Sequence, residues 1–172
     1  MKQKEIIINN GLLLGLVNIL MLIVICFVDV TIMVDYNLIC ILVILLITIL
    51  FGVLSVIKVK KGLDGFISFK RVFIVFFITA FIGIIINLLF TYVLFNFIDV
   101  DSGVLAKERI YESTLEQLEN YNLPEHIKEI ELSKVLNKDF FGIYELLKSS
   151  ISILIVTGVL GIIISFVLKN DE

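Results

Sequence analysis

Four long apolar runs dominate the chain, and each is about as long as a helix that crosses a lipid bilayer. They cover approximately residues 11–33, 36–57, 72–98 and 147–168. Crossing about 30 Å of hydrocarbon takes about 20 residues of helix. Because lipid offers backbone groups no hydrogen-bond partner, a spanning segment must be a helix or part of a closed barrel. The runs are continuous rather than alternating, which predicts helices.

The composition agrees with a membrane protein. The chain has 172 residues, of which 59% are hydrophobic, whereas soluble domains are about 45–50% apolar. The first run is too long for a secretory signal peptide and no A-x-A cleavage site follows it, so we interpret it as a retained span. We therefore expect an all-α fold, an integral membrane four-helix bundle that forms a single membrane domain over residues 1–172.

A short basic turn between the second and third runs predicts the orientation of the chain. It reads KVKKGLDGFISFKR and contains one acidic residue, Asp64, and five basic ones: Lys58, Lys60, Lys61, Lys70 and Arg71. The preceding link, residues 29–35, has no Lys or Arg. Cytoplasmic flanks of membrane helices collect Lys and Arg. These five residues therefore predict a cytoplasmic turn, and four spans then place both termini in the cytoplasm.

The third and fourth runs are separated by a long charged loop, residues 99–146, that we expect on the opposite, extracytoplasmic side. The segment from Asp99 to Lys148 has eleven acidic and six basic residues. Helical spacing of Val104, Tyr111, Leu115 and Leu118 predicts an amphipathic helix over about 102–120. Pro124 suits the first turn of a second helix. The apolar stripe permits either docking on lipid or packing over the mouth of the bundle.

The same loop carries an acidic stripe at helical spacing. It consists of Glu108, Glu112, Glu116 and Glu119. Such a stripe can attract cations or a basic partner, but we favour a solvated face. The net charge of −3 is segregated along the chain and does not indicate a nucleic-acid partner.

The interiors of the four runs contain no Asp, Glu, Lys, Arg or His. Because intramembrane ionisable residues mark ion and proton pathways, their absence argues against a pump. Asn18, Asn87 and Thr91 are polar residues within the runs and candidates for intramembrane polar contacts. They could line a polar path, but we favour interhelical hydrogen bonds for the two amides.

Small residues indicate close packing of helices. Gly11 and Gly15 form a G-x-x-x-G motif in the first run. Such motifs let two helix backbones approach closely, either between chains or within one. With four helices in one chain, we expect contacts within the chain.

No catalytic or metal-binding pattern stands out. His126 is the only histidine, and it lies beside Glu125 and Glu129. A solvated surface histidine explains it better than a metal ligand. The chain has no H-E-x-x-H, phosphate-loop or nucleophile-elbow motif. We therefore expect no cofactor, no metal and no enzymatic activity.

Three stretches carry a resemblance to a known family. They are NNGLLLGL at Asn9–Leu16, GFISF at Gly65–Phe69 and LFTYVLFNFID at Leu89–Asp99. With the long charged loop and last span, the whole chain resembles the four-span bacterial membrane proteins grouped as "domain of unknown function 4199", found mainly in Bacteroidetes. The resemblance implies a four-helix protein of the inner membrane. It implies no activity and no site residues.

The leading functional hypothesis is a non-enzymatic protein of the bacterial inner membrane that engages a membrane or periplasmic protein partner. The contact surface would be the acidic loop or the surface of the bundle. A small oligomeric transporter or channel is the alternative, and an enzyme acting on lipid at the membrane interface ranks last. The lipid bilayer is its environment, and homo-oligomerisation is left open.

Overall fold

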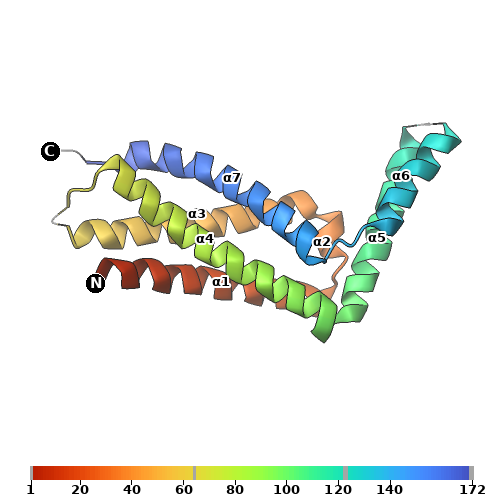
Figure 1. Cartoon of the computed structure of the whole chain (residues 1–172), viewed down its shortest axis with the longest axis horizontal. Helices are drawn as coiled ribbons and strands as arrows, with labels where there is room; N and C mark the ends of the chain where they lie inside the picture. The colour runs from red at the N-terminus through yellow and green to blue at the C-terminus, as the bar shows by residue number, and fades with distance from the viewer. Residues whose placement is uncertain (1, 64, 122–123, 171–172) are drawn as a thin grey trace.

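Four long helices form the body of the protein in a computed structural model that describes residues 2–63, 65–121 and 124–170 (Figure 1). They are α1 (Lys2–Val28), α3 (Asn37–Lys61), α4 (Phe69–Val93, continued by the π-helical turn η1, Leu94–Ile98) and α7 (Ile143–Leu168). All four are long and apolar enough to cross a membrane. The predicted all-α membrane bundle is therefore confirmed.

Three shorter helices lie at one end of the bundle. They are α2 (Ile32–Asp35), α5 (Val100–Asn120) and α6 (Glu125–Asn137). Figure 1 shows α5 and α6 as a helical hairpin that runs across this end at a steep angle to the long helices. We call this the hairpin end and the opposite one, where both termini lie, the termini end. The helical insertion predicted between the third and fourth spans is therefore present.

The helix boundaries extend beyond most of the apolar runs. The first helix begins at Lys2 rather than near residue 11, the second ends at Lys61, the third begins at Phe69 and the fourth at Ile143. Apolar runs mark only the hydrocarbon core, whereas a helix can continue into the polar interface because its backbone bonds are internal.

The first helix ends at Val28, directly before the predicted link of residues 29–35. Asp29 is responsible, because its carboxylate accepts hydrogen bonds from the N–H (2.8 Å) and the hydroxyl (2.7 Å) of Thr31. Such an Asx turn offers the backbone an alternative to the helix. The turn leads directly into α2.

The central helix of the bundle is α4, which packs against α1, α3 and α7. An ideal Cβ on Gly11 of α1 would lie 2.7 Å from Cβ of Ile82, and one on Gly15 would lie 2.7 Å from Cγ2 of Ile86. The two glycines therefore let α1 and α4 approach closely. The prediction that this motif packs within the chain is confirmed.

Helix α4 with η1 spans 30 residues, about 45 Å at 1.5 Å per residue. That length exceeds a hydrocarbon core of about 30 Å, and a long span adapts by tilting. Figure 1 shows α4 crossing the other long helices obliquely. At the hairpin end it finishes in a buried cluster, in which the rings of Phe95 and Phe141 have centroids 4.3 Å apart.

Candidate functional site

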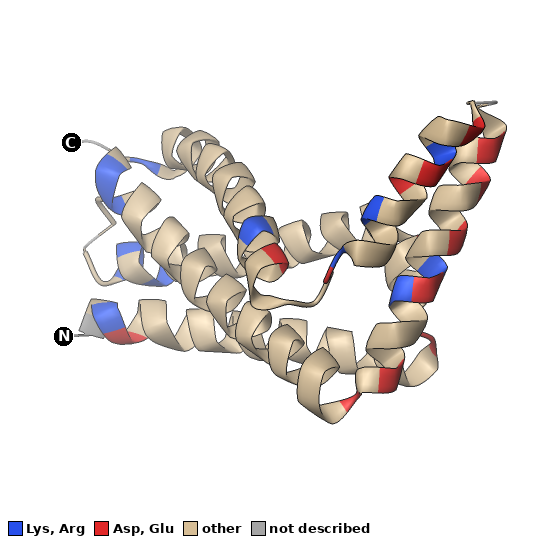
Figure 2. Cartoon of the chain, turned by 45° about the vertical axis from the view of Figure 1, so that its right-hand side comes forward, with Lys and Arg blue, Asp and Glu red and all other residues tan. Residues whose placement is uncertain are grey.

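The basic turn ties together the helix ends at the termini end, where Figure 2 shows Lys and Arg gathered. Lys60 Nζ donates a hydrogen bond to the carbonyl oxygen of Leu168, the last residue of α7 (3.2 Å). Arg71 donates to Oε1 of Gln3 in α1 (2.8 Å). The other three basic residues of the turn are exposed: Lys58, Lys61 and Lys70. Asp64 lies outside the described residues.

Lys58 also begins a polar network that reaches into the bundle. Its Nζ donates to Oδ1 of Asn10 (3.0 Å), and Nδ2 of Asn10 donates to the hydroxyl of Ser55 (3.2 Å). The hydroxyls of Ser55 and Thr79 are hydrogen-bonded at 2.9 Å. Asn10 is 2% exposed, and Ser55 and Thr79 are fully buried. The network therefore links α1, α3 and α4 within the core.

This network was not predicted from the sequence, because Asn10 precedes the first apolar run. One signal was available. Ser55 and Lys58 are three positions apart and therefore share a face of α3. A basic residue on the same helix face as a serine indicates that polar contacts continue along that face.

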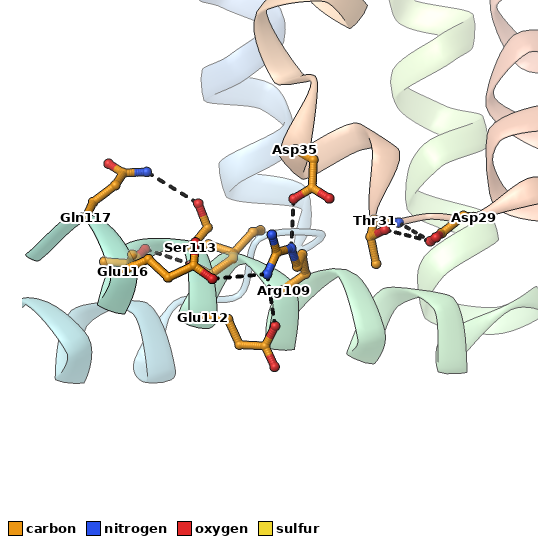
Figure 3. A network of polar contacts seen from close by, with 10 residues as sticks. Asp29, Thr31, Asp35, Arg109, Glu112, Ser113, Glu116 and Gln117 are labelled. Carbon is orange, nitrogen blue, oxygen red and sulfur yellow. Dashed lines mark hydrogen bonds and ion pairs between the residues drawn. The ribbon is translucent and has the colours of Figure 1, made fainter. Parts of the chain in front are cut away.

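At the hairpin end, Arg109 fastens α5 to α2 (Figure 3). Its Nε donates to Oδ1 of Asp35 (2.7 Å), and its Nη1 lies 3.1 Å from Oε2 of Glu112 and 3.6 Å from Oε1 of Glu116. The hydrogen bonds to Asp35 and Glu112 raise the pKa of Arg109. Two of the four acidic residues in the predicted solvated stripe are thus ion-paired.

Two different sides of α5 face different parts of the protein. Ala106 and Ile110 lie over the mouth of the bundle. Val104 and Tyr111, from the predicted apolar stripe, instead line a groove with Val135 of α6. The stripe therefore faces the second hairpin helix, and a different face of α5 covers the bundle.

Beneath α5 lies a hollow that continues into the bundle. Its upper part has a volume of about 440 Å³ and is roofed by α5. The deeper part, about 190 Å³, lies between α1, α3, α4 and α7 and shares Asn37, Thr91 and Ser149 with the upper part. Asn18, Asn87 and Thr91 all line this deeper cavity. The structure thus brings together the three intramembrane polar residues selected from the sequence.

Among the described residues, the side chains of Asn18 and Asn87 do not form the interhelical hydrogen bonds that we favoured for them. Asn18 is 3% exposed, and its Oδ1 has no hydrogen-bond partner among the described residues. Thr91 donates its hydroxyl to the carbonyl oxygen of Asn87 in its own helix (2.8 Å). An unpaired buried acceptor costs about 1–3 kcal/mol.

The described residues that line both parts of the hollow are uncharged. No group of three or more His, Cys, Asp or Glu that could hold a metal occurs in the part of the chain that the structure describes. His126 is exposed in the first turn of α6. The lining offers amides and hydroxyls, which can bind an uncharged molecule through hydrogen bonds.

The fold and the site define a multi-pass membrane protein with an uncharged cavity at one end, covered by a charged helical hairpin. The family model "Protein of unknown function (DUF4199)" matches residues 9–170, so the chain belongs to this family. The resemblance found in the sequence is thereby confirmed. No curated protein and no solved structure matches the chain.

Proposed function

We propose that this is a non-enzymatic protein of a bacterial cytoplasmic (inner) membrane, whose α5–α6 hairpin binds a protein partner outside that membrane. Both termini would then lie in the cytoplasm. The separation of charge supports this orientation, since Lys and Arg gather at the termini end and most Asp and Glu at the hairpin end (Figure 2). Basic flanks remain on the cytoplasmic side of a membrane.

The observation that carries the proposal is that much of the hairpin stands clear of the bundle. Helix α6 packs on α5, and Figure 1 shows the hairpin tip projecting beyond the long helices. Near the tip, Tyr121 is 75% exposed, and Ile130 of α6 is 52% exposed. A helical pair held at its base and free at its tip is suited to contact another molecule.

The charge of the hairpin indicates the chemistry of the partner. Between Val100 and Asn137 the chain has eight acidic and four basic residues. A basic surface with a small apolar centre would complement it, because opposite potentials steer association and suppress wrong partners. The non-enzymatic part of the proposal rests on the cavity, whose described lining offers amides, hydroxyls and the thiol of Cys40 but no carboxylate, imidazole or amine.

Crosslinking in intact cells tests the proposal. The intact protein should capture a partner, and a variant with residues 100–137 replaced by a flexible linker should lose it. The double charge reversal Glu119→Lys and Glu129→Lys should also weaken capture, since both residues lie outside the Arg109 contacts. Glu5→Lys, at the exposed termini end, is the matched control and should leave capture unchanged. Recovery of the same partners without the hairpin would contradict the proposal.

A second candidate is a small transporter or channel assembled by oligomerisation. It is favoured by the convergence of Asn18, Asn87 and Thr91 on one cavity. In liposomes, the protein would then increase the flux of a neutral solute such as glycerol, and Asn87→Leu would reduce that flux. A flux that Asn87→Leu leaves unchanged would count against transport.

A further inference from the structure

The deeper cavity contains one buried polar atom that the protein leaves unsatisfied. Asn18 lines the cavity, and its buried Oδ1 has no hydrogen-bond partner among the described residues. Its residue is ten positions from Val28, the end of α1, which places it about 15 Å into the bundle. A hydroxyl group both donates and accepts, so it can satisfy an amide in either orientation.

The walls select an uncharged molecule. Besides Asn18, the polar groups lining the deeper cavity are amides and hydroxyls: Asn37, Asn87, Thr91, Ser149 and Ser150. A phosphate or carboxylate placed there would meet no opposite charge, and a buried unpaired charge is strongly disfavoured. The volume of about 190 Å³ corresponds to about six waters at 30 Å³ each. A small polyol head group therefore fits.

Two helices that barely pack on each other form side walls of the deeper cavity. Its side walls come from α3, with Cys40 and Ile44, and from α7, with Leu146 and Ile153. Because these helices pack on α4 but barely on each other, few contacts between them oppose an acyl chain that lies between them. Ile44 and Ile153 would keep such a chain in apolar surroundings on its way to the bilayer.

We infer that this cavity is a binding site for an uncharged lipid with a hydroxyl-bearing head group, of the monoacylglycerol or diacylglycerol type. The head group hydrogen-bonds to the Asn18 amide and lies against Asn87, while the acyl chain passes between α3 and α7. The site does not depend on a partner for the hairpin. Nor does it depend on which end of the bundle faces the cytoplasm.

Photolabelling of the full chain in phosphatidylcholine nanodiscs tests the inference. The probe is a monoacylglycerol with a diazirine in its acyl chain, and the matched probe is the methyl ester of the same fatty acid, which has no hydroxyl. The monoacylglycerol should label peptides of α3 and α7 around Ile44 and Ile153. Unlabelled mono-oleoylglycerol should compete for the site, whereas methyl oleate should not.

Two variants test the role of the amides. Asn18→Leu should reduce labelling about tenfold, the ratio expected for one lost hydrogen bond. Asn87→Leu should reduce it as well, and it supplies the test if Asn18→Leu fails to fold. Thr157→Val is the matched control, because Thr157 is also buried with an unpaired hydroxyl but does not line the cavity. Labelling of this control should match the wild type.

Three results would overturn the inference. Equal labelling by the methyl ester would mean that the head-group hydroxyl is not recognised. If Asn18→Leu and Asn87→Leu were labelled as fully as the wild type, the binding site would not be this cavity. If free glycerol competed at the concentration at which mono-oleoylglycerol competes, the ligand of the site would be a water-soluble polyol and not a lipid.

Discussion

Arg109 of α5 and Asp35 of α2 lie 74 positions apart in the sequence, yet Arg109 Nε donates a 2.7 Å hydrogen bond to Asp35 Oδ1. The carboxylates of Glu112 and Glu116 approach the other side of the same guanidinium group. A single cation thus pairs with two acids of its own helix and joins that helix to the link after the first span.

Arg109→Gln should loosen α5 from the bundle. Both partners of the pair are about one-third exposed, with side-chain exposures of 28% and 33%, and such surface pairs contribute little individually. We expect the amides in the first turns of α5 to exchange with solvent roughly two- to fivefold faster. Hydrogen exchange with mass spectrometry measures this. Lys134→Gln is the control, since its 2.6 Å pair with Glu131 lies within α6; equal effects would contradict a clamping role for Arg109.

Gly83→Ala should destabilise the packing of α1 on α4. An added Cβ would lie 2.5 Å from Cγ and Cδ2 of Leu14, which is fully buried and has no room to move. Overpacking of this kind costs about 1–3 kcal/mol. Gly158→Ala is the control, because the nearest atom to its Cβ would be Cε2 of Phe77 at 3.7 Å. SDS titration followed by circular dichroism should show earlier unfolding of Gly83→Ala alone.

The buried hydroxyl pair of Ser55 and Thr79 should show measurable coupling. A double-mutant cycle with Ser55→Ala and Thr79→Val should give about 0.6 kcal/mol, and no more than about 1.7 kcal/mol, as for other hydrogen bonds between membrane helices. The same SDS titration measures it. Ser152→Ala removes an exposed hydroxyl bonded only within its own helix and should have little effect. Strict additivity of Ser55→Ala and Thr79→Val would show that their hydrogen bond contributes nothing.

The long helices could be predicted from sequence because lipid leaves a span almost no alternative. A continuous apolar run must satisfy its backbone internally, whatever its neighbours are. For α5 and α6, helical spacing and Pro124 gave the elements in the same local way. The exact helix ends were harder to predict from the sequence. At the end of α1, for example, Asp29 forms a side-chain turn with Thr31, and hydropathy alone does not mark that position.

The contacts of polar residues could not be predicted, because they depend on how helices rotate and diverge. Asn10 and Asn18 lie on the same helix, yet Asn10 meets Ser55, whereas Oδ1 of Asn18 meets no partner among the described residues. Spacing along one helix does not reveal that α3 and α7 barely pack on each other. For the same reason, the sequence left open whether the apolar stripe that includes Tyr111 docks on lipid or packs over the mouth of the bundle. In the structure, Tyr111 lies beside α6.

Thr31→Val should raise the pKa of Asp29. The hydroxyl and then the N–H of Thr31 stabilise the ionised carboxylate and hold the pKa of Asp29 below its ordinary value. Because the folded-state pKa is lowered, this turn stabilises the protein above the ordinary carboxyl pKa, and the contribution is lost as pH falls through the lowered value. NMR titration of the Asp29 carboxyl carbon in micelles measures the midpoint. Thr114→Val, which removes a hydroxyl bonded to Ile110, should leave the midpoint unchanged.

Cysteine labelling in intact cells tests the proposed orientation. With Cys26 and Cys40 replaced by alanine, Tyr121→Cys marks the hairpin tip and Lys61→Cys marks the basic turn, and both positions are exposed. The five basic residues of the turn favour retention on the cytoplasmic side. A membrane-impermeant maleimide should therefore label Tyr121→Cys in intact cells and Lys61→Cys only after permeabilisation. The reverse pattern would place the termini outside and the hairpin, with any partner it binds, in the cytoplasm.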